Sequence, residues 1–143
     1  MRPFFMILLL LAPGTFTQAL SQSYLVKVTI TDLRSDKGKL YLSIYNSEKG
    51  YPKEPSAAYR LAFSDIRSGK STVLLAGIPR GAYAIACYHD ENDNGKLDSN
   101  FLGIPKEGTG ASNNARGSLG PPKFRDAKFQ LASDTSLTIK INY

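Results

Sequence analysis

The chain has 143 residues, a formal net charge of +6, one cysteine, one histidine and no tryptophan. This length suits a single packed domain and is too short for two ordinary hydrophobic cores. A single cysteine excludes an internal disulfide, and the basic residues are scattered rather than gathered in a run that would favour nucleic-acid binding. We therefore expect one domain without internal cross-links and without a nucleic-acid partner.

The first 21 residues have the three-part layout of a secretory signal peptide. Arg2 supplies the positive start, residues 4–12 form a short apolar run, and small residues precede a cleavage site after Ser21. The apolar run is too short to span a bilayer as a helix, and no later stretch approaches that length. We expect the signal peptide to be removed, leaving residues 22–143 as a periplasmic or secreted domain without a membrane span.

The rest of the chain shows the period-two alternation of apolar and polar residues that is typical of half-buried strands. It predicts seven strands separated by turn signals, at residues 26–31, 40–45, 59–63, 72–75, 82–88, 129–131 and 137–142. Residues 82–88 carry no charge, which favours a central strand covered on both faces. We predict an all-β fold, a single seven-stranded antiparallel β-sandwich of the immunoglobulin or transthyretin-like kind with one long ordered loop.

The predicted long loop runs from His89 to Asp126 and is rich in glycine, proline and asparagine. A connection of this length in a compact domain is normally functional or disordered. Aromatic and aliphatic residues within it, such as Phe101 and Ile104, favour order. We therefore expect the functional residues of the domain to lie in this loop.

Oxygen-bearing side chains occur at alternate positions directly after the predicted central strand. Calcium takes about six to eight oxygen ligands, and a tight loop provides them from alternate side chains, a backbone carbonyl after a glycine and a later carboxylate. The segment is similar to the first half of a calcium loop of the EF-hand kind. The candidate ligands are the side chains of Asp90, Asn92, Asn94 and Asp98 and the backbone carbonyl of Lys96.

A turn without metal has the same composition, because Asp and Asn side chains bond to nearby backbone and glycine accepts left-handed angles. Phe101 stands where EF-hand loops have a bidentate glutamate, no helices are expected beside the loop, and two of the early ligands are amides. These differences favour weak binding, with Asp98, Glu107 or Asp126 completing the shell. Calcium, the candidate cofactor, and a purely structural turn both stay open.

A hydrolase-type enzyme is the alternative to a binding function. It would use the loop residues His89, Asp90, Glu107 and Asp126. No acid–base or nucleophile pair stands at an informative spacing, and Cys87 lies two residues from His89 on one strand, which does not create a hydrogen-bonded pair. We expect Cys87 to be a small buried residue and the protein not to be an enzyme.

Five segments carry a family resemblance, at residues 79–84, 89–98, 103–108, 112–114 and 120–124. In this order they resemble the bacterial exported family catalogued as domain-of-unknown-function family 2141, over nearly all of the chain after residue 21. The Pro-x-Gly-x-Tyr entry at residues 79–83 is also similar to transthyretin-like and collagen-adhesin B-type modules. The resemblance implies an exported β-sandwich and implies no activity.

These observations together predict a non-enzymatic binding or scaffolding module of the cell envelope. Its partner is expected to be an envelope protein, a peptide or a glycan. An interaction module exposes an apolar or aromatic patch, for which Tyr45, Tyr51 and Phe101 are the candidates.

Overall fold

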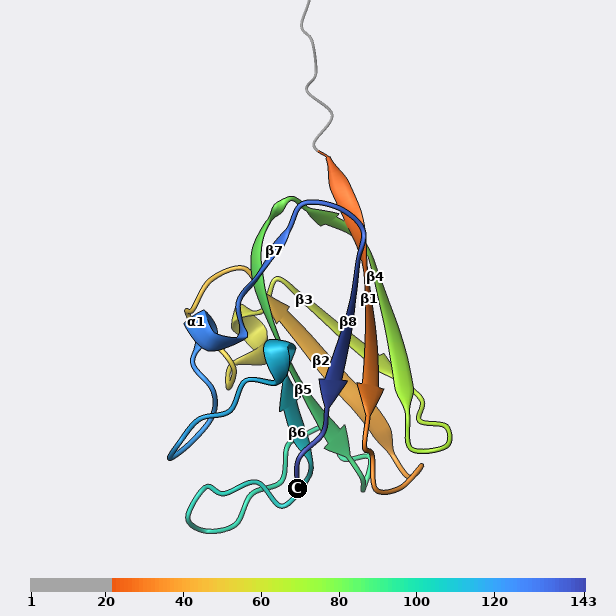
Figure 1. Cartoon of the computed structure of the whole chain (residues 1–143). Coiled ribbons are helices and arrows are strands. Elements are labelled where there is room, and N and C mark those ends of the chain that lie inside the picture. Colours follow the sequence, from red (N-terminus) through yellow and green to blue (C-terminus); the bar gives the residue numbers. More distant parts are fainter. Residues whose placement is uncertain (1–21) are drawn as a thin grey trace, which may run out of the picture.

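The computed structural model describes residues 22–143, so the signal peptide expected at residues 1–21 lies outside the described residues. Figure 1 shows strands of two sheets and a few short helical turns. The elements are β1 (Ser23–Thr31), β2 (Lys39–Tyr45), η1 (Pro55–Ala57), β3 (Arg60–Ser64), β4 (Ser71–Pro79), β5 (Gly81–Asp90), β6 (Thr109–Ala111), η2 (Ser112–Asn114), α1 (Phe124–Ala127), β7 (Phe129–Leu131) and β8 (Thr135–Lys140). No helix within residues 22–143 is long and apolar enough to cross a membrane.

The smaller sheet has the strand order β4-β1-β8. β1 pairs with β4 in the antiparallel direction and with β8 in the parallel direction, where Val26 lies opposite Thr135 and Thr31 opposite Lys140. The alternation predicted for β1 is present, since Val26, Val28 and Ile30 are fully buried and the residues between them face outward.

The larger sheet has the strand order β3-β2-β5-β6, and β5 is its centre. One edge of β5 pairs with β2 from Ala84 to Asp90. The other edge is shared, because β7 pairs with the first residues of β5 and β6 pairs with residues 86–88. The prediction of a central strand here is therefore confirmed.

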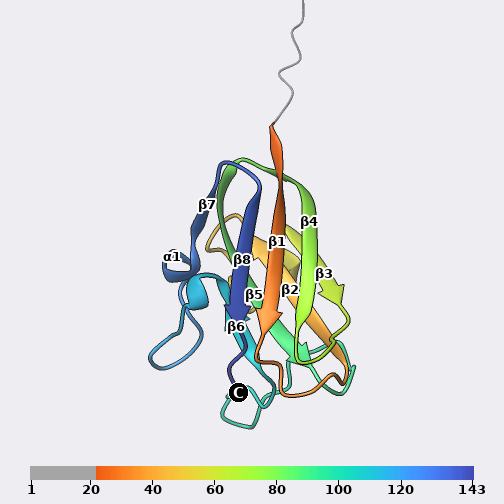
Figure 2. The same cartoon turned by 45° about the vertical axis from the view of Figure 1, so that its right-hand side comes forward.

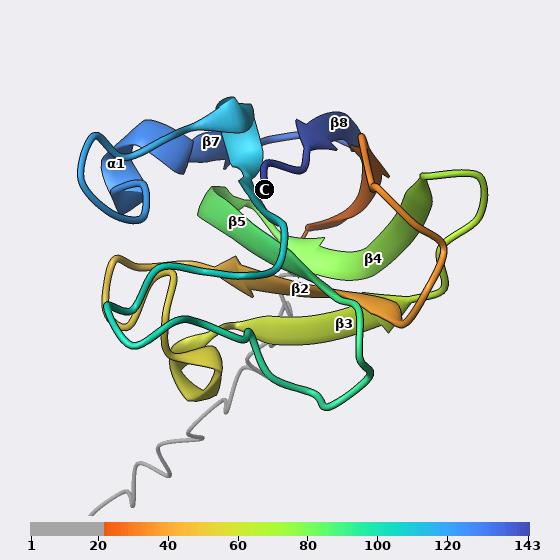
Figure 3. The ribbon, with the colours of Figure 1, turned by 90° about the horizontal axis from the view of Figure 1, so that it is seen from below.

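One hydrophobic core lies between the two sheets, which pack face to face in the view of Figure 3. Each sheet contributes alternate residues, for example Ile30 and Ile139 from the smaller sheet and Leu42 and Ile85 from the larger. Within the described residues, the buried members of this core lie between residues 26 and 141.

Residues 22–143 form eight strands rather than the predicted seven. The additional strand is β6, which lies inside the predicted long loop and pairs with β5. The expected all-antiparallel arrangement is also wrong for one pair, because β1 and β8 are parallel. The irregular part of the long loop is thereby divided into residues 91–108, between β5 and β6, and residues 115–123, before α1.

A second small cluster covers part of the outer face of the larger sheet. Ala84, Ala111 and Ala127 are buried there under Tyr51 and Phe124. η2 fixes this cover. The Ser112 Oγ accepts a hydrogen bond from the Ile85 N–H of β5 at 2.9 Å and donates to the carbonyl of Ala127.

Candidate functional site

The loop of residues 91–108 begins and ends in buried polar side chains. His89, Asp90 and Glu107 have relative exposures of 0%, 0% and 6%, although all three are polar or charged. We call these three residues the foot of the loop. In Figures 1 and 2 the loop projects beyond the strands at the end of the molecule where the C-terminus lies. A buried polar group is costly unless it is hydrogen-bonded. The hydrogen-bond partners of these three residues therefore show whether the foot holds the structure of the loop or is available to a ligand.

Asp90 closes the turn that follows β5. Its Oδ1 accepts the Asn94 N–H at 3.1 Å, and its Oδ2 accepts the Gly95 N–H at 2.7 Å. Gly95 has a φ of +76°, as expected for the turn predicted at this position. Both carboxylate oxygens of Asp90 therefore hold backbone of the same turn.

Three further predicted calcium ligands converge beside this turn. The Asn92 Nδ2 donates to the Asp98 Oδ2 at 2.6 Å, and the Asn94 Nδ2 lies 3.1 and 3.2 Å from the two Asp98 carboxylate oxygens. The amide oxygens are used elsewhere. The Asn92 Oδ1 accepts the Asn94 N–H at 3.2 Å, and the Asn94 Oδ1 accepts the Lys96 N–H at 2.9 Å.

This arrangement determines how well the loop suits calcium. The groups that face Asp98 are amide nitrogens, whereas calcium takes oxygen ligands. Turning the two amides over would break the two hydrogen bonds that hold their oxygens to backbone. Within residues 22–143 no group of three or more His, Cys, Asp or Glu side chains is placed to hold a metal ion. Calcium binding by Asp90, Asn92, Asn94, Lys96 and Asp98 stays a prediction, and the geometry satisfies the alternative of a hydrogen-bonded turn.

Glu107 joins the two ends of the loop. Its Oε1 accepts the Glu91 N–H at 2.9 Å, and its Oε2 accepts the Asp98 N–H at 3.0 Å. The sequence offered Glu107 only as an extra ligand or an enzymatic carboxylate, because no local pattern shows that its side chain reaches back to residue 91.

His89 ties the loop to two distant segments. Its Nε2 lies 2.7 Å from the Lys37 carbonyl, which only accepts, so this nitrogen carries the proton. Its Nδ1 lies 2.7 Å from the Tyr143 hydroxyl oxygen, which accepts the Arg34 N–H at 3.0 Å. Burial raises the pKa of the Tyr143 hydroxyl, so the hydroxyl stays protonated at neutral pH.

The four residues of the hydrolase alternative have separate partners. Asp126 lies in α1 beside Arg125, with the two charged groups 3.6 Å apart, while His89, Asp90 and Glu107 bond to backbone or to Tyr143. No hydrogen bond or ion pair in the described part of the chain joins any two of the four. Cys87 is buried in the core, and desolvation raises its pKa to about 12, so the thiol stays protonated at neutral pH.

The three aromatic residues proposed from the sequence as a binding patch differ in exposure. Tyr45 is fully buried, and Tyr51 packs edge-to-face on it with ring centroids 5.2 Å apart. Phe101 is 95% exposed. Tyr51 is half-buried, so Phe101 is the most exposed of the three.

The outer face of the larger sheet carries an aromatic row that the sequence pattern did not indicate. Phe63 of β3, Tyr41 of β2 and Tyr88 of β5 lie in register across three strands. The Phe63 and Tyr41 ring centroids are 6.1 Å apart, and the Tyr41 and Tyr88 rings are stacked at 5.3 Å. Phe63 is 66% exposed, and Leu61 beside it on β3 is 56% exposed. The Tyr88 hydroxyl donates to the Gly95 carbonyl at 3.2 Å, which places the loop beside one end of the row.

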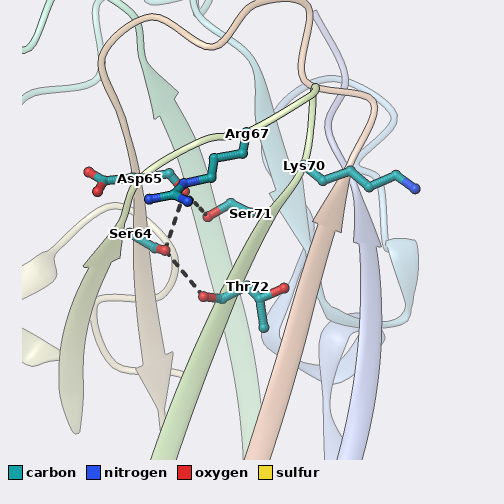
Figure 4. A pocket seen from close by; sticks show the side chains of 6 residues that line it. All are labelled: Ser64, Asp65, Arg67, Lys70, Ser71 and Thr72. Atoms are coloured by element: carbon teal, nitrogen blue, oxygen red, sulfur yellow. Dashed lines mark hydrogen bonds between the residues drawn. The ribbon is translucent and has the colours of Figure 1, made fainter.

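The connection between β3 and β4 surrounds a small polar hollow, shown in Figure 4. The Ser71 Oγ donates to the Asp65 carbonyl at 3.0 Å, and the Ser64 Oγ lies 3.2 Å from the Thr72 carbonyl. Both hydroxyls donate hydrogen bonds to backbone carbonyls of this connection, so they stabilise the connection itself.

The comparisons with known proteins give one match. The sequence model of a family described as "Uncharacterized protein conserved in bacteria (DUF2141)" matches residues 28–140. No curated protein and no solved structure matches the chain. The likeness to transthyretin-like and adhesin B-type modules stays a prediction.

Proposed function

The chain belongs to the uncharacterised bacterial family DUF2141, and from this premise we propose that it is a non-enzymatic binding module of the cell envelope whose ligand contacts the aromatic row on the larger sheet. The observation that carries the proposal is the exposure of Phe63 and Leu61 on the outward positions of β3, beside the half-exposed Tyr41 and Tyr88.

The position of these side chains supports a binding surface. A sheet with one face in water normally carries polar residues on that face, whereas here adjacent strands present apolar and aromatic ones. Exposed apolar patches mark interaction sites, and aromatic side chains provide large contact areas with few rotatable bonds. The row stands on hydrogen-bonded strands, so little ordering is needed when a ligand binds.

Charged groups lie at one end of the row. The Lys39 Nζ is 5.7 Å from the centroid of the Phe63 ring and 3.7 Å from the Asp93 carboxylate. A ligand that covers Phe63 therefore also meets a cation and an anion. The ligand classes that fit are envelope glycans, peptides and proteins that combine apolar surface with polar groups.

The non-enzymatic role is supported by how the candidate acid–base residues are used. Both ring nitrogens of His89 and both carboxylate oxygens of Asp90 and Glu107 have hydrogen-bond partners within the protein. A catalytic acid or base has to reach the substrate.

The ligand surface is tested by NMR on isotope-labelled residues 22–143, titrated with soluble glycans and with short apolar peptides. We expect the shifted resonances to cluster at Tyr41, Phe63 and Tyr88, and Phe63→Ser to abolish them. Leu74→Ser is the matched control, because Leu74 is 63% exposed on the smaller sheet. Shifts that cluster elsewhere, or that survive Phe63→Ser, would overturn the proposal.

Calcium is a second candidate ligand because Asn92, Asn94 and Asp98 converge, although the groups that face Asp98 are amide nitrogens. A thermal melt in chelator, in millimolar calcium and in magnesium tests it. A site filled to about one hundred times its dissociation constant adds about 2.7 kcal/mol and would raise the midpoint by several degrees. Because the amide oxygens already hold backbone, we expect no rise. A rise with calcium alone would show that calcium binds the folded domain.

Export belongs to the same proposal and rests on residues 1–21. Mass spectrometry of the protein recovered from its bacterial host should find a chain that begins at Gln22 in the periplasm or medium. A chain that retains residues 1–21 in the cytoplasm would contradict it.

A further inference from the structure

β3 is an end strand of the larger sheet, because it pairs with β2 and, within residues 22–143, with no other strand. In Figure 3 it lies on the far side of β2 from β5. An end strand directs alternate backbone N–H and C=O groups away from its neighbour, where a further strand can pair with them. The edge of β3 is therefore open to a partner if the protein itself leaves these groups uncovered.

The hydrogen bonds between β2 and the chain around β3 identify the outward groups. The Ile44 carbonyl accepts the Tyr59 N–H at 2.8 Å, so Ile44 directs its backbone groups towards β3. Ile44 lies opposite Arg60, and because the direction alternates along an antiparallel pair, Leu61 and Phe63 direct their N–H and C=O groups away from β2. No hydrogen bond within the described residues reaches these four groups from the other side.

The neighbouring edge of the smaller sheet is covered. β4 is the end strand there, and its Thr72 and Ala76 carbonyls accept hydrogen bonds from the side chains of Ser64, at 3.2 Å, and Arg60. Figure 4 shows the Ser64 hydrogen bond to Thr72. Side chains of β3 thus cover the edge of β4, whereas no side chain within residues 22–143 bonds to the outward groups of β3. Proteins normally cover an exposed edge because it pairs with other chains, so the uncovered edge of β3 indicates a place for a partner.

We propose that an extended peptide segment of a partner protein pairs with β3 as an additional strand, bonding to the N–H and C=O groups of Leu61 and Phe63. This docking rests on the proposed ligand surface, because the same two residues carry its exposed side chains. Added strands gain affinity from main-chain hydrogen bonds and specificity from alternate side chains. A peptide side chain opposite Phe63 lies about 4.5–5.5 Å away on the same face and extends the aromatic row. The peptide should therefore carry apolar residues at alternate positions.

The chemistry of the edge favours a peptide over a glycan or a second copy of the chain. N–H and C=O groups that alternate at the spacing of a strand are complemented by another peptide backbone, whereas the hydroxyls of a glycan are not arranged as such pairs. A second folded copy would meet β3 along five residues, few of the roughly 20–30 that each partner contributes to a stable interface. A flexible peptide reaches from the edge onto the exposed Leu61 and Phe63 side chains as well.

Backbone methylation of the peptide tests the pairing without altering the protein. The probe is a short capped peptide that alternates threonine with valine and phenylalanine, titrated by NMR into the isotope-labelled protein. Methylating the backbone nitrogens of one alternate set should weaken binding about tenfold or more, and methylating the other set should leave it unchanged. In antiparallel pairing the apolar set is the sensitive one, because its N–H groups face β3.

The outcomes separate this docking from the ligand surface. Absence of binding by the unmodified peptide, or equal binding of the two methylated peptides, would overturn strand addition. Shifts at Tyr41, Phe63 and Tyr88 with a glycan, or with both methylated peptides, would in that case leave the proposed ligand surface standing. Loss of every response at Phe63, to peptides and glycans alike, would overturn both.

Amide hydrogen exchange gives a direct readout of the new hydrogen bonds. The Leu61 and Phe63 N–H groups should exchange rapidly in the free protein and about tenfold or more slowly when the peptide saturates it. The Ala62 N–H is the internal control, because Ala62 lies opposite Leu42 and faces β2. Unchanged exchange at Leu61 and Phe63 in the presence of bound peptide would refute the pairing.

A pair of variants separates the backbone group from the side chain. Leu61→Pro removes one outward N–H, at an edge position where proline is tolerated, and should abolish peptide binding. Leu61→Ala is the matched control, which loses the side chain but keeps the N–H, and it should bind more tightly than Leu61→Pro. Equal binding by the two variants would contradict strand addition. So would a sedimentation-velocity result in which Leu61→Pro changes only self-association, since the occupant of the edge would then be a second copy.

Discussion

At the foot of the loop after β5, the polar side chains of His89, Asp90 and Glu107 are buried, whereas at the tip the apolar side chains of Phe101, Leu102 and Ile104 are exposed. Each region reverses the usual preference of its residues. The foot is stabilised by hydrogen bonds to backbone, and the tip has few contacts within the protein. The foot therefore maintains the structure of the loop, whereas the exposed tip contributes little to stability. Substitutions in the foot should lower the free energy of unfolding, and substitutions at the tip should leave it nearly unchanged.

The largest effect is expected where the chain passes closest to the foot. Gly38 has a φ of +65°, and a Cβ on it would lie 1.8 Å from the backbone oxygen of Asp90. Gly38→Ala should therefore lower the free energy of unfolding by about 3–5 kcal/mol, from overpacking and backbone strain together. Gly95→Ala is the matched control, because its φ is +76° but the nearest side-chain atom is 4.0 Å from the added Cβ. It should cost about 1 kcal/mol. Urea unfolding measures both, and equal losses would show that the foot isn't tightly packed against residue 38.

The next effect concerns the charge of the foot. Asp90→Asn leaves one acceptor oxygen and places an NH₂ group against a backbone N–H, so we expect a loss of about 2 kcal/mol in the free energy of unfolding. Asp93→Asn is the control, because Asp93 is exposed and its Lys39 partner is 3.7 Å away. Its cost should stay below about 0.5 kcal/mol. Chemical denaturation at pH 7 measures the free energy of unfolding of both variants. A larger loss from Asp93→Asn than from Asp90→Asn would contradict the prediction.

A smaller effect is expected from an exposed carboxylate at the same end of the molecule. Asp36 accepts the N–H groups of Ser68 and Gly69, both at 2.8 Å, and these hydrogen bonds lower its pKa below the ordinary value of 3.8. A lowered folded-state pKa means that this stabilisation is present above the unfolded-state pKa and is lost as pH falls through the folded one. Asp36→Asn should lower stability at pH 7, and the difference from the unmodified chain should shrink towards pH 3. If the stability difference between the two chains grew as the pH falls, the prediction would be wrong.

The smallest effect on stability is expected at the tip. Phe101→Ser removes a side chain that is 95% exposed, so the free energy of unfolding should change by less than about 0.5 kcal/mol. A thermal melt checks this. A clear loss of stability would mean that Phe101 packs on the protein in solution and that the contrast between foot and tip is smaller than the structure indicates.

Most of the strands were predictable, because a period of two is a local signal, but which face is buried was not. On β3 the apolar Leu61 and Phe63 face outward, while Arg60, Ala62 and Ser64 face inward. The alternation is identical for either face, so the sequence did not reveal that these residues form the candidate binding surface.

Pairings between distant segments could not be predicted. β6 has the sequence Thr109-Gly110-Ala111, which lacks alternation, and it is a strand only because β5 offers a free edge. The contacts of the foot also include a partner that is distant in sequence. The turn chemistry of Asp90 and Asn94 was visible locally, whereas the partner of His89 lies 54 residues away at Tyr143.

The parallel pairing of β1 with β8 has a consequence for how the domain folds. β1 lies between β4 and β8 in its sheet, so its central position is complete only after residues 135–140 are available. The Leu25 N–H bonds to the Asp134 carboxylate across 109 residues of sequence. Contacts this distant in sequence make folding slow, because the intervening chain must first be brought together. A nascent chain should therefore keep Val26, Val28 and Ile30 accessible to chaperones until nearly the whole domain has emerged from the ribosome.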